Sequence, residues 1–599
     1  MMTEVVAIRR FSRLTLAAAA GTYLLIVLGG LVRATGAGLA CPDWPLCQGQ
    51  LIPPFEPLVL IEWSHRLVAS VVGFLTLAVA VMAWRRFRDR REFTWTATLA
   101  LALVVVQIAL GGLTVRFELS PWLVVAHLGI AMAFFATLIM LAATALLGGG
   151  EAHRDRFWTL ALLTVLTTYL LILVGGYVSA SGAGLACPDW PLCYGQLVPS
   201  LQGLVGVHFL HRLAAAVVGL LILGTAAAAY RTQGHRPLIL AASAIAVGLL
   251  ALQVILGALN IEYQLADSVT TAHLATAAAL FATLVALVVL ADRFPAGDAL
   301  PLIRTAGLEP RPRVQRVLDY VALTKPRIII LLLVTAFAAM LVAAPGTVSP
   351  WIILATLVGG AMSAGSANAI NQLLERDIDA LMTRTRRRPI PSGRVEPPFA
   401  FAFAVLLGMS AFALLAAAVN LLSAVLATIA LLFYVFVYTV WLKRSTPQNI
   451  VIGGAAGAMP PLVGWAAATG RVEIPALILF LIIFLWTPPH FWALALFRRD
   501  DYARAHIPML PVVAGDDETR RQILIYTVVL VAATLLLYPL GGMGWLYVIS
   551  AAALGAMFIS LAVRVRSQRT HKAAVQLFSY SMVYLALLFA AMVADRLLG

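Results

Sequence analysis

Seventeen long apolar runs dominate the sequence and decide what the chain can fold into. Each run approaches the ~20 residues that a helix needs to cross a bilayer core of roughly 30 Å. Hydrophobic residues make up 62% of the 599 residues and charged residues 12%, whereas soluble domains carry roughly 45–50% and about 25%. This excludes a soluble enzyme and a disordered chain, and a membrane β-barrel would show alternating segments of ~10 residues. We therefore predict an all-α polytopic membrane protein with helices at about 14–33, 61–84, 93–114, 122–147, 158–179, 206–229, 238–259, 268–290, 328–345, 351–373, 397–416, 421–441, 449–468, 474–496, 522–540, 545–564 and 574–597.

The basic residues predict the orientation in a cell membrane. The formal net charge is +15, but the arginines lie in short loops between apolar runs, so a nucleic-acid partner is not expected. Placing the N-terminus in the cytoplasm puts nearly all of these loops inside, as the positive-inside rule requires. An odd number of crossings then leaves the C-terminus outside.

An internal repeat organises the first eight predicted helices. Residues 33–51 and 179–197 match at 16 of 19 positions, at an offset of 146 residues. Four crossings return the chain to its starting side, so the two repeats face the same way. We predict repeat units at about 1–150 and 151–291 within a domain of residues 1–291.

Four histidines recur at the same offset, near the predicted outer helix ends. His65 and His127 are 62 residues apart, as are His211 and His273. Ionisable residues within membrane spans are rare and usually functional. Two imidazoles from facing helices can bind a haem iron inside a bundle. A zinc ion is the alternative, but its four ligands would have to come from both repeats.

One position breaks the repeat beside the first histidine. Glu62 lies three residues before His65 and shares its helix face, whereas the second repeat has His208 there. This indicates a reactive first site and a cofactor-holding second site; a solvated interfacial carboxylate is the alternative. Arg66 and Arg212 follow the paired histidines, where they could bind haem propionates or extend to the interface.

The only four cysteines lie in the repeated outer loops. An oxidising compartment favours disulfides between Cys41 and Cys47 and between Cys187 and Cys193. A site with four thiolate ligands is the alternative, as is a redox role for the first pair beyond stapling the loop.

These features resemble the haem A synthases that have two four-helix halves. The resemblance rests on the twin CPDWPLC loops, the Glu62-x-x-His65 opening and the four matched histidines. It implies oxidation of the C8 methyl of haem O to a formyl group. His65 and His127 would hold the substrate haem, Glu62 would take part in the reaction, and His211 and His273 would ligate a haem b.

Acidic residues mark the predicted inner helix ends of the second half. Asn371, Glu375 and Asp379 are spaced i, i+4 and i+8, which predicts that they line one helix face. Asp500 and Asp501 end a later helix on the same side. Such clusters can hold Mg²⁺, which would bridge to a diphosphate. A clamp for that diphosphate is predicted from basic residues nearby: Lys325, Arg384, Arg388, Lys443 and Arg444.

This half resembles the intramembrane prenyltransferases, and among them the protohaem IX farnesyltransferases, also called haem O synthases. Residues 371–389 carry the first resemblance; residues 323–327, 438–449, 487–492 and 501–511 narrow it. The middle acid, Glu375, departs from the Asp of the wider superfamily, and the shorter second cluster leaves either Asp500 or Asp501 as the ligand. The resemblance implies nine helices and transfer of farnesyl from farnesyl diphosphate to protohaem IX, with Asn371, Glu375, Asp379 and Asp501 catalytic.

Together the halves indicate a fusion that makes haem O and then haem A. We predict a linker at 292–315 and a prenyltransferase domain at 316–599. The substrates would be protohaem IX, farnesyl diphosphate and haem O, with haem b and Mg²⁺ as cofactors and an electron acceptor that the sequence does not identify; a homo-oligomer is one option. The rival interpretation is a di-haem electron-transfer module joined to a quinone-ring prenyltransferase. A transporter would need polar residues at the membrane midplane, whereas these lie near the helix ends.

Overall fold

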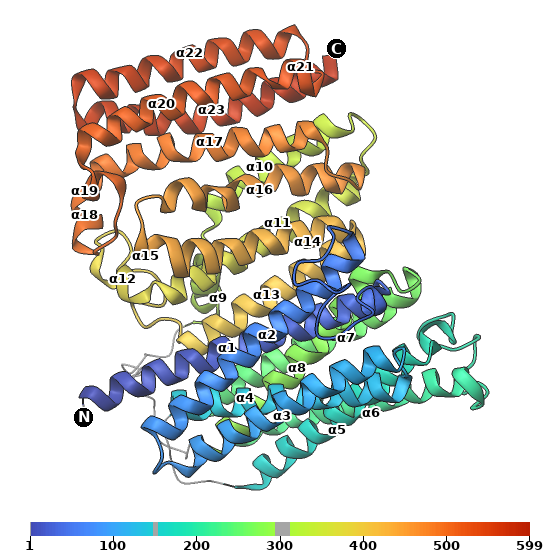
Figure 1. The fold of residues 1–599 in the computed structure, drawn as a ribbon. Helices are drawn as coiled ribbons and strands as arrows, with labels where there is room; N and C mark the ends of the chain where they lie inside the picture. Colours follow the sequence, from blue (N-terminus) through green and yellow to red (C-terminus); the bar gives the residue numbers. More distant parts are fainter. Residues whose placement is uncertain (1, 148–153, 294–311, 599) are drawn as a thin grey trace. The chain divides into compact units, whose positions relative to one another are not determined.

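A computed structural model describes residues 2–147, 154–293 and 312–598 of the protein (Figure 1). Over these residues, 17 helices are long and apolar enough to cross a membrane, so the predicted all-α polytopic fold and its helix number are confirmed. The contacts divide the chain into two compact units, Met1–Ala299 and Leu300–Gly599. We call them the N-terminal and C-terminal units and describe each by itself.

The N-terminal unit contains two repeats of four long helices. Corresponding helices have equal lengths: α2 and α6 have 30 residues each, α3 and α7 have 26, and α4 and α8 have 27. The elements are α1 (Met2–Ala34), η1 (Ala37–Leu39), α2 (Pro57–Arg86), α3 (Arg91–Arg116), α4 (Pro121–Leu147), α5 (Arg156–Ala180), η2 (Ala183–Leu185), α6 (Gly203–Thr232), α7 (Pro237–Glu262) and α8 (Asp267–Arg293).

The two repeats pack together through α1, α4, α5 and α8. Tyr23 on α1 donates a hydrogen bond to the carbonyl of Ala275 on α8, and Tyr169 on α5 donates to Gly129 on α4. The two tyrosines are equivalent positions of the repeats, 146 residues apart, and so are their partners Gly129 and Ala275. Each repeat therefore donates to the other the same contact that it receives, as a pseudo-twofold axis requires. The duplication of the sequence is therefore also a duplication of the interface.

The described residues of the C-terminal unit form a short helix followed by nine candidate membrane spans. The predicted linker at 292–315 lies mainly on residues 294–311, outside the described part of the chain, and its described end is helical. The elements are α9 (Arg313–Thr324), α10 (Pro326–Ala343), α11 (Pro350–Leu374), α12 (Arg376–Leu381), α13 (Pro397–Ala418), α14 (Leu421–Leu432), η3 (Phe433–Leu442), α15 (Lys443–Ser445), α16 (Asn449–Thr469), α17 (Ile474–Phe497), α18 (Arg499–Arg504), α19 (Leu510–Val513), α20 (Gly515–Leu535), α21 (Leu537–Gly541), α22 (Trp545–Gln568) and α23 (His571–Leu598).

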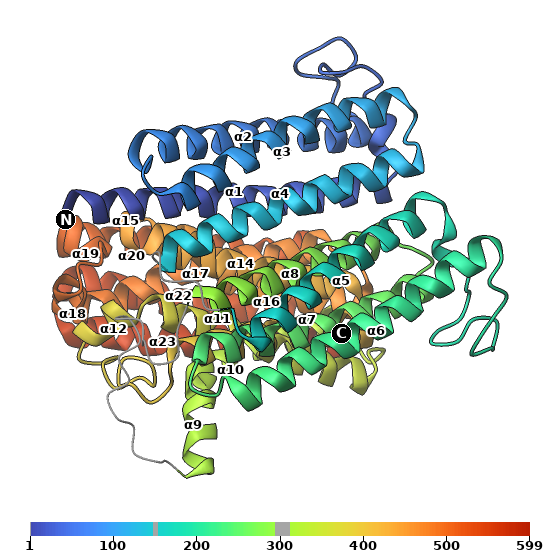
Figure 2. The same cartoon turned by 90° about the horizontal axis from the view of Figure 1, so that it is seen from below.

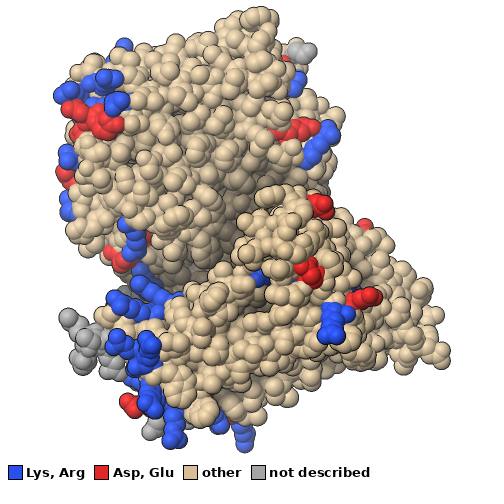
Figure 3. Space-filling view, in the orientation of Figure 1, with Lys and Arg blue, Asp and Glu red and all other residues tan. Residues whose placement is uncertain are grey.

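The surfaces of both units suit a hydrocarbon environment. Figure 3 shows charged side chains gathered near the helix ends, while the flanks between them carry other residue types. Large apolar side chains such as Phe74, Leu220 and Ile549 are exposed on these flanks. Burial of apolar surface against lipid, rather than water, therefore stabilises the outer faces. The chain is a multi-pass membrane protein.

Candidate functional sites

The four histidines lie within the first three turns of α2, α4, α6 and α8. His65 lies near His127, and His211 lies near His273. All four Nδ1 atoms are buried, and among the described residues none accepts or donates a hydrogen bond. Buried polar atoms usually have partners, so these rings suit an additional ligand between facing helices.

Glutamine and glycine residues complete each histidine pair. The Nε2 atoms of Gln107 and His127 are 3.1 Å apart, and the same distance joins Gln253 and His273. A Cβ on Gly29 would lie 3.2 Å from the His65 ring, and one on Gly175 would lie 3.1 Å from the His211 ring. The sequence shows these residues at the repeat offset, but gives them no role, because their neighbours are fixed only by helix packing.

Glu62 is buried rather than solvated, so the interfacial alternative is wrong. Its Oε1 accepts a hydrogen bond from Arg66 Nε at 3.0 Å. In the second repeat, Arg212 Nε lies 3.2 Å from His208 Nε2, and the Cys187 N–H lies 3.3 Å from His208 Nδ1. A neutral imidazole accepts at one nitrogen only, so one of the two contacts forms at a time. A carboxylate therefore distinguishes the first site chemically.

Arg66 and Arg212 bind the cysteine loops. Arg66 donates to the carbonyls of Cys41, Asp43 and Leu46 at 2.8, 2.7 and 2.6 Å. Arg212 repeats these bonds with the carbonyls of Cys187, Asp189 and Leu192. Each loop thus folds back over the start of its helix, and contacts of these arginines with haem propionates or with the membrane interface stay predictions.

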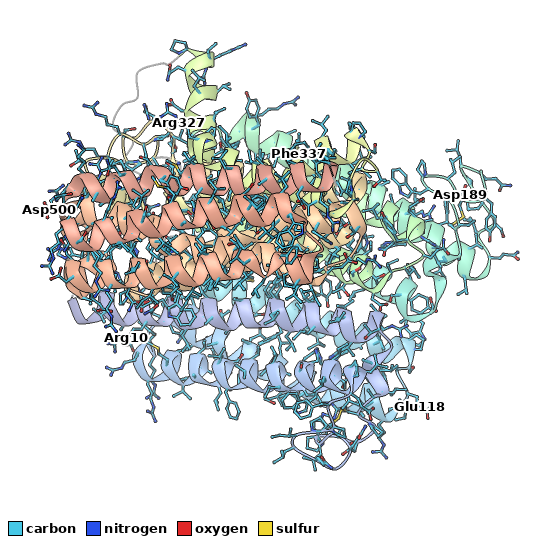
Figure 4. The ribbon with its side chains drawn as sticks, turned by 90° about the horizontal axis from the view of Figure 1, so that it is seen from above. Arg10, Glu118, Asp189, Arg327, Phe337 and Asp500 are labelled. Carbon is cyan, nitrogen blue, oxygen red and sulfur yellow. A yellow bond between two sulfur atoms is a disulfide. The ribbon has the colours of Figure 1, made fainter. Side chains whose placement is uncertain are left out.

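The cysteine loops are closed by the two disulfides expected from the sequence, Cys41–Cys47 and Cys187–Cys193. Within each loop an aspartate caps a tight turn. Asp43 accepts from the N–H groups of Gly49 and Gln48, and these bonds, Gly49 first, hold the pKa of Asp43 below its usual range. Figure 4 shows Asp189, its counterpart, in a loop beyond the helix ends. A disulfide and an aspartate therefore fix each loop, which is bound by the arginine that follows His65 or His211.

The acidic triplet of the C-terminal unit is buried, but it does not lie on one continuous helix. Helix α11 ends at Leu374 and α12 begins at Arg376, with Glu375 at the junction. The i, i+4 bonding nevertheless continues, since Glu375 N donates to Asn371 O and Asp379 N donates to Glu375 O. Asn371, Glu375 and Asp379 are all buried while Asp377 is exposed, so the triplet keeps a common side.

Each member of the triplet has one basic partner. Lys325 Nζ donates to Asn371 Oδ1 at 2.7 Å. Lys443 Nζ is 2.5 Å from Glu375 Oε1, and Arg388 donates to both Asp379 oxygens at 2.9 and 2.7 Å. Three of the five predicted clamp residues thus contact the predicted metal ligands directly.

Charge and burial oppose each other at this cluster. Burial raises the pKa of Glu375, but the charges of Lys443 and Lys325 outweigh it and leave the pKa below its usual range. Burial, reinforced by Arg388, lowers the pKa of Lys325 to about 7. The cluster is therefore a compact set of mutually neutralising groups, which an incoming anion and cation would rearrange together.

The other two predicted clamp residues lie elsewhere. Arg444 donates to the exposed Asp377 at 2.9 and 2.8 Å, and it does not contact the triplet. Arg384 is exposed, near enough to Tyr438 for its charge to act on that side chain. The sequence could not separate these arginines from Arg388, because all three lie in segments that it predicts to be inner loops.

The second acidic cluster approaches the same region through Arg504. Asp500 is exposed, at the end of the helices in Figure 4, whereas Asp501 is buried and bound to Arg504. Arg504 also donates to Thr383 at 3.4 Å, in the segment that follows α12. Burial favours Asp501 as the ligand, although no three Asp, Glu, His or Cys side chains of the described residues converge as a metal site.

Thr439 contacts the triplet, which the sequence does not predict. Thr439 accepts from Asn371 Nδ2 at 3.1 Å and lies in η3, a π-helical stretch. Such stretches are rare and frequent at functional sites. A Cβ on Gly453 would lie 2.2 Å from the Tyr438 ring, so only glycine lets α16 approach. His490 stacks between Trp486 and Phe578, and its Nδ1 lies 2.7 Å from Ser581 Oγ.

Comparison with known proteins divides the chain in the same way. Residues 12–59 and 54–285 match the family described as cytochrome oxidase assembly protein, and residues 332–589 match the UbiA prenyltransferase family. A solved structure of digeranylgeranylglyceryl phosphate synthase is 19% identical, with a TM-score of 0.42, and covers 48% of this chain and 100% of that chain.

Relatives extend over the whole chain. A protoheme IX farnesyltransferase of Chloroflexus aurantiacus is 39% identical over 607 residues, which is 99% of this chain and 100% of the relative. One from Gloeobacter violaceus is 57% identical over 288 residues, 48% of this chain and 94% of the relative. With its two matched regions and a relative aligned from end to end, the chain belongs to the protoheme IX farnesyltransferase family, in a form that also carries a cytochrome oxidase assembly protein region.

Proposed function

We propose that the chain converts protohaem IX to haem O in its C-terminal unit and haem O to haem A in its N-terminal unit. The observation that carries the proposal is the pairing of each triplet residue, Asn371, Glu375 and Asp379, with one basic side chain in a buried cluster. The family membership supports protohaem IX and farnesyl diphosphate as the substrates.

The triplet and its basic partners supply both the metal ligands and the cations of a diphosphate site. The oxygens of Asn371, Glu375 and Asp379 suit Mg²⁺, which prefers oxygen ligands, and when bound it would neutralise the charge on the departing diphosphate. Lys443 and Arg388 now occupy these oxygens. When released, they would reach the diphosphate and stabilise it as it leaves, while the buried setting keeps water from the allylic carbon.

The farnesyl group then joins the haem. Its allylic C–O bond breaks as the diphosphate leaves, and the C2 vinyl carbon of protohaem forms the new C–C bond. Water adds to the resulting cation and loses a proton, which gives the hydroxyethylfarnesyl group. Asp501 is buried, and Arg504 links it to Thr383 in the segment that follows α12. It would help to bind the diphosphate.

The N-terminal unit would oxidise the C8 methyl of this product. His65 and His127 would hold haem O, and the buried Glu62, held by Arg66, would take up or deliver protons one helical turn away. His211 and His273 would hold a haem b, which supplies electron transfer when bound. Their unpartnered Nδ1 atoms fit such a ligand. Oxidation of the methyl to a formyl group takes its oxygen atom from water and releases protons and electrons, so an electron acceptor is also required.

Purified full-length protein in lipid nanodiscs tests the proposal. With protohaem IX, farnesyl diphosphate and Mg²⁺ we expect haem O by chromatography, and none after chelation of Mg²⁺. The rival is a quinone-ring prenyltransferase joined to an electron-transfer module. Farnesylation of 4-hydroxybenzoate without haem O formation would establish that rival instead.

A further inference from the structure

Helix α9 has an apolar face that no described residue of the C-terminal unit covers. Val314, Val317, Leu318 and Val321 are 72, 61, 52 and 45% exposed. Their spacing of i, i+3, i+4 and i+7 places them on one side of the helix. The helix is too short and too polar to span a membrane, so this face is not explained by a transmembrane position.

The opposite face of α9 is firmly attached to the unit. Leu323 is fully buried, Asp319 is buried and pairs with Arg394 at 3.4 Å, and the Tyr320 ring packs on Phe403 at 5.2 Å. The final carbonyls of α9 accept hydrogen bonds from Gln372 and Asn368 of α11. The helix therefore has a fixed orientation, and its exposed apolar face is a stable feature.

The position of α9 points to a membrane surface. Lys325 adopts the left-handed conformation, with φ of 55°, and the span α10 begins at the next residue, Pro326. Figure 2 shows α9 crossing the direction of α10, and Figure 4 shows it standing away from the unit at the Arg327 end of that helix. Because the spans run across the bilayer, a helix that crosses their direction at the start of α10 runs along the bilayer surface.

The charges of α9 favour an anionic surface. Arg313 and Arg316 are exposed on the helix, and the exposed Arg327 follows it. Helices with an apolar face and flanking arginines lie in the headgroup region, where anionic lipids attract their charges. We propose that α9 is an interfacial helix whose valine and leucine face enters the acyl boundary of an anionic leaflet. Because α9 leads directly to Lys325, this lipid contact also holds the position from which Lys325 reaches Asn371.

Spin labels on the full chain in nanodiscs test the proposal. The four native cysteines are paired, so Val317→Cys and Leu318→Cys each introduce a single reactive thiol. Gln315→Cys is the matched control, exposed on the same helix but outside the apolar face. We expect the labels at 317 and 318 to collide several-fold more with oxygen than with a water-soluble nickel complex. The label at 315 should show the reverse.

Three results would overturn the proposal. Equal access of the nickel complex at 317 and 315 would mean that the face meets water. Protection of 317 from both oxygen and nickel would mean that protein covers it, either the N-terminal unit or a second copy. An unchanged label depth when phosphatidylglycerol is replaced by phosphatidylcholine would remove the role of anionic lipid.

Discussion

At the scale of single residues, the ion pairs and hydrogen bonds separate the predicted clamp residues that contact the triplet from those that do not. The sequence predicts the triplet and a set of basic residues, since their types and spacing are visible in it. It does not predict that Arg388 binds Asp379 while Arg444 binds the exposed Asp377. These partners depend on how α12 turns away from α11 at Glu375, which is a tertiary feature.

Asp379→Asn and Glu375→Gln should each abolish haem O formation. Both remove a buried carboxylate charge, and loss of metal or diphosphate stabilisation costs roughly 10²-fold in rate or more. Asp377→Asn is the matched control, because this carboxylate is exposed and outside the cluster. Haem O measured by chromatography should be near normal in the control. Equal losses in all three variants would remove the special role of the triplet.

Glu62→Gln should stop the oxidation of haem O but leave its synthesis intact. The substitution keeps the shape of a side chain that Arg66 holds, while it removes a base, and such groups contribute about 10²–10⁴-fold. Haem O should accumulate in membranes. A normal yield of haem A in this variant would show that the difference between Glu62 and His208 is not catalytic.

At the scale of elements, α1 and α5 are equivalent helices of the two repeats. A pair of adjacent glycines on each helix allows close contact with both its own repeat and the other one. Gly29 faces His65 in its own repeat, whereas Gly30 faces Leu274, next to His273 in the other repeat. Gly175 and Gly176 repeat this with His211 and Leu128. The sequence predicts the duplicated histidines from their offset alone. It cannot predict the exchanged contacts, because they arise only when α1, α4, α5 and α8 meet.

Gly175→Val should weaken haem b binding by displacing the His211 ring, since overpacking costs about 1–3 kcal/mol. Gly224→Val, on α6 where nothing lies within 4 Å of a new Cβ, is the control and should keep its haem.

His211→Ala and His273→Ala should lose the low-spin haem b signal outright. His65→Ala and His127→Ala should retain it and block haem A. The opposite pattern in visible spectra would reverse the two repeats.

At the scale of the whole molecule, the number of spans follows from hydropathy, but the orientation remains a prediction from the arginine-rich loops. That prediction puts the histidines at outer helix ends and the acidic triplet at inner ends. The two sites would then lie on opposite sides of a core of roughly 30 Å. Haem O would have to move between them, held in the membrane by its farnesyl group.

Single cysteines test this orientation. A membrane-impermeant thiol reagent added outside intact cells should label Leu201→Cys, in the second outer loop, and miss Arg386→Cys, after the triplet. Both positions are exposed, so access depends on the side of the membrane. Labelling of both from outside would contradict the opposite-side arrangement.

Separate expression of the halves tests whether the sites need a common pocket. A cut near Gly307, outside the described residues, should leave two proteins that together still make haem A, at a reduced rate. Transfer through the bilayer requires only that both are in one membrane. Haem O without any haem A would indicate that the fusion itself channels the intermediate.

The most direct test of the two-step account is the haem content of a host lacking its own haem O and haem A enzymes. We predict haem A with the native chain and haem O with Glu62→Gln. Only haem B should be found with Asp379→Asn, or with the double variant that combines Glu62→Gln and Asp379→Asn. Haem A from the Asp379→Asn chain, or haem O from the double variant, would contradict the order of the two sites.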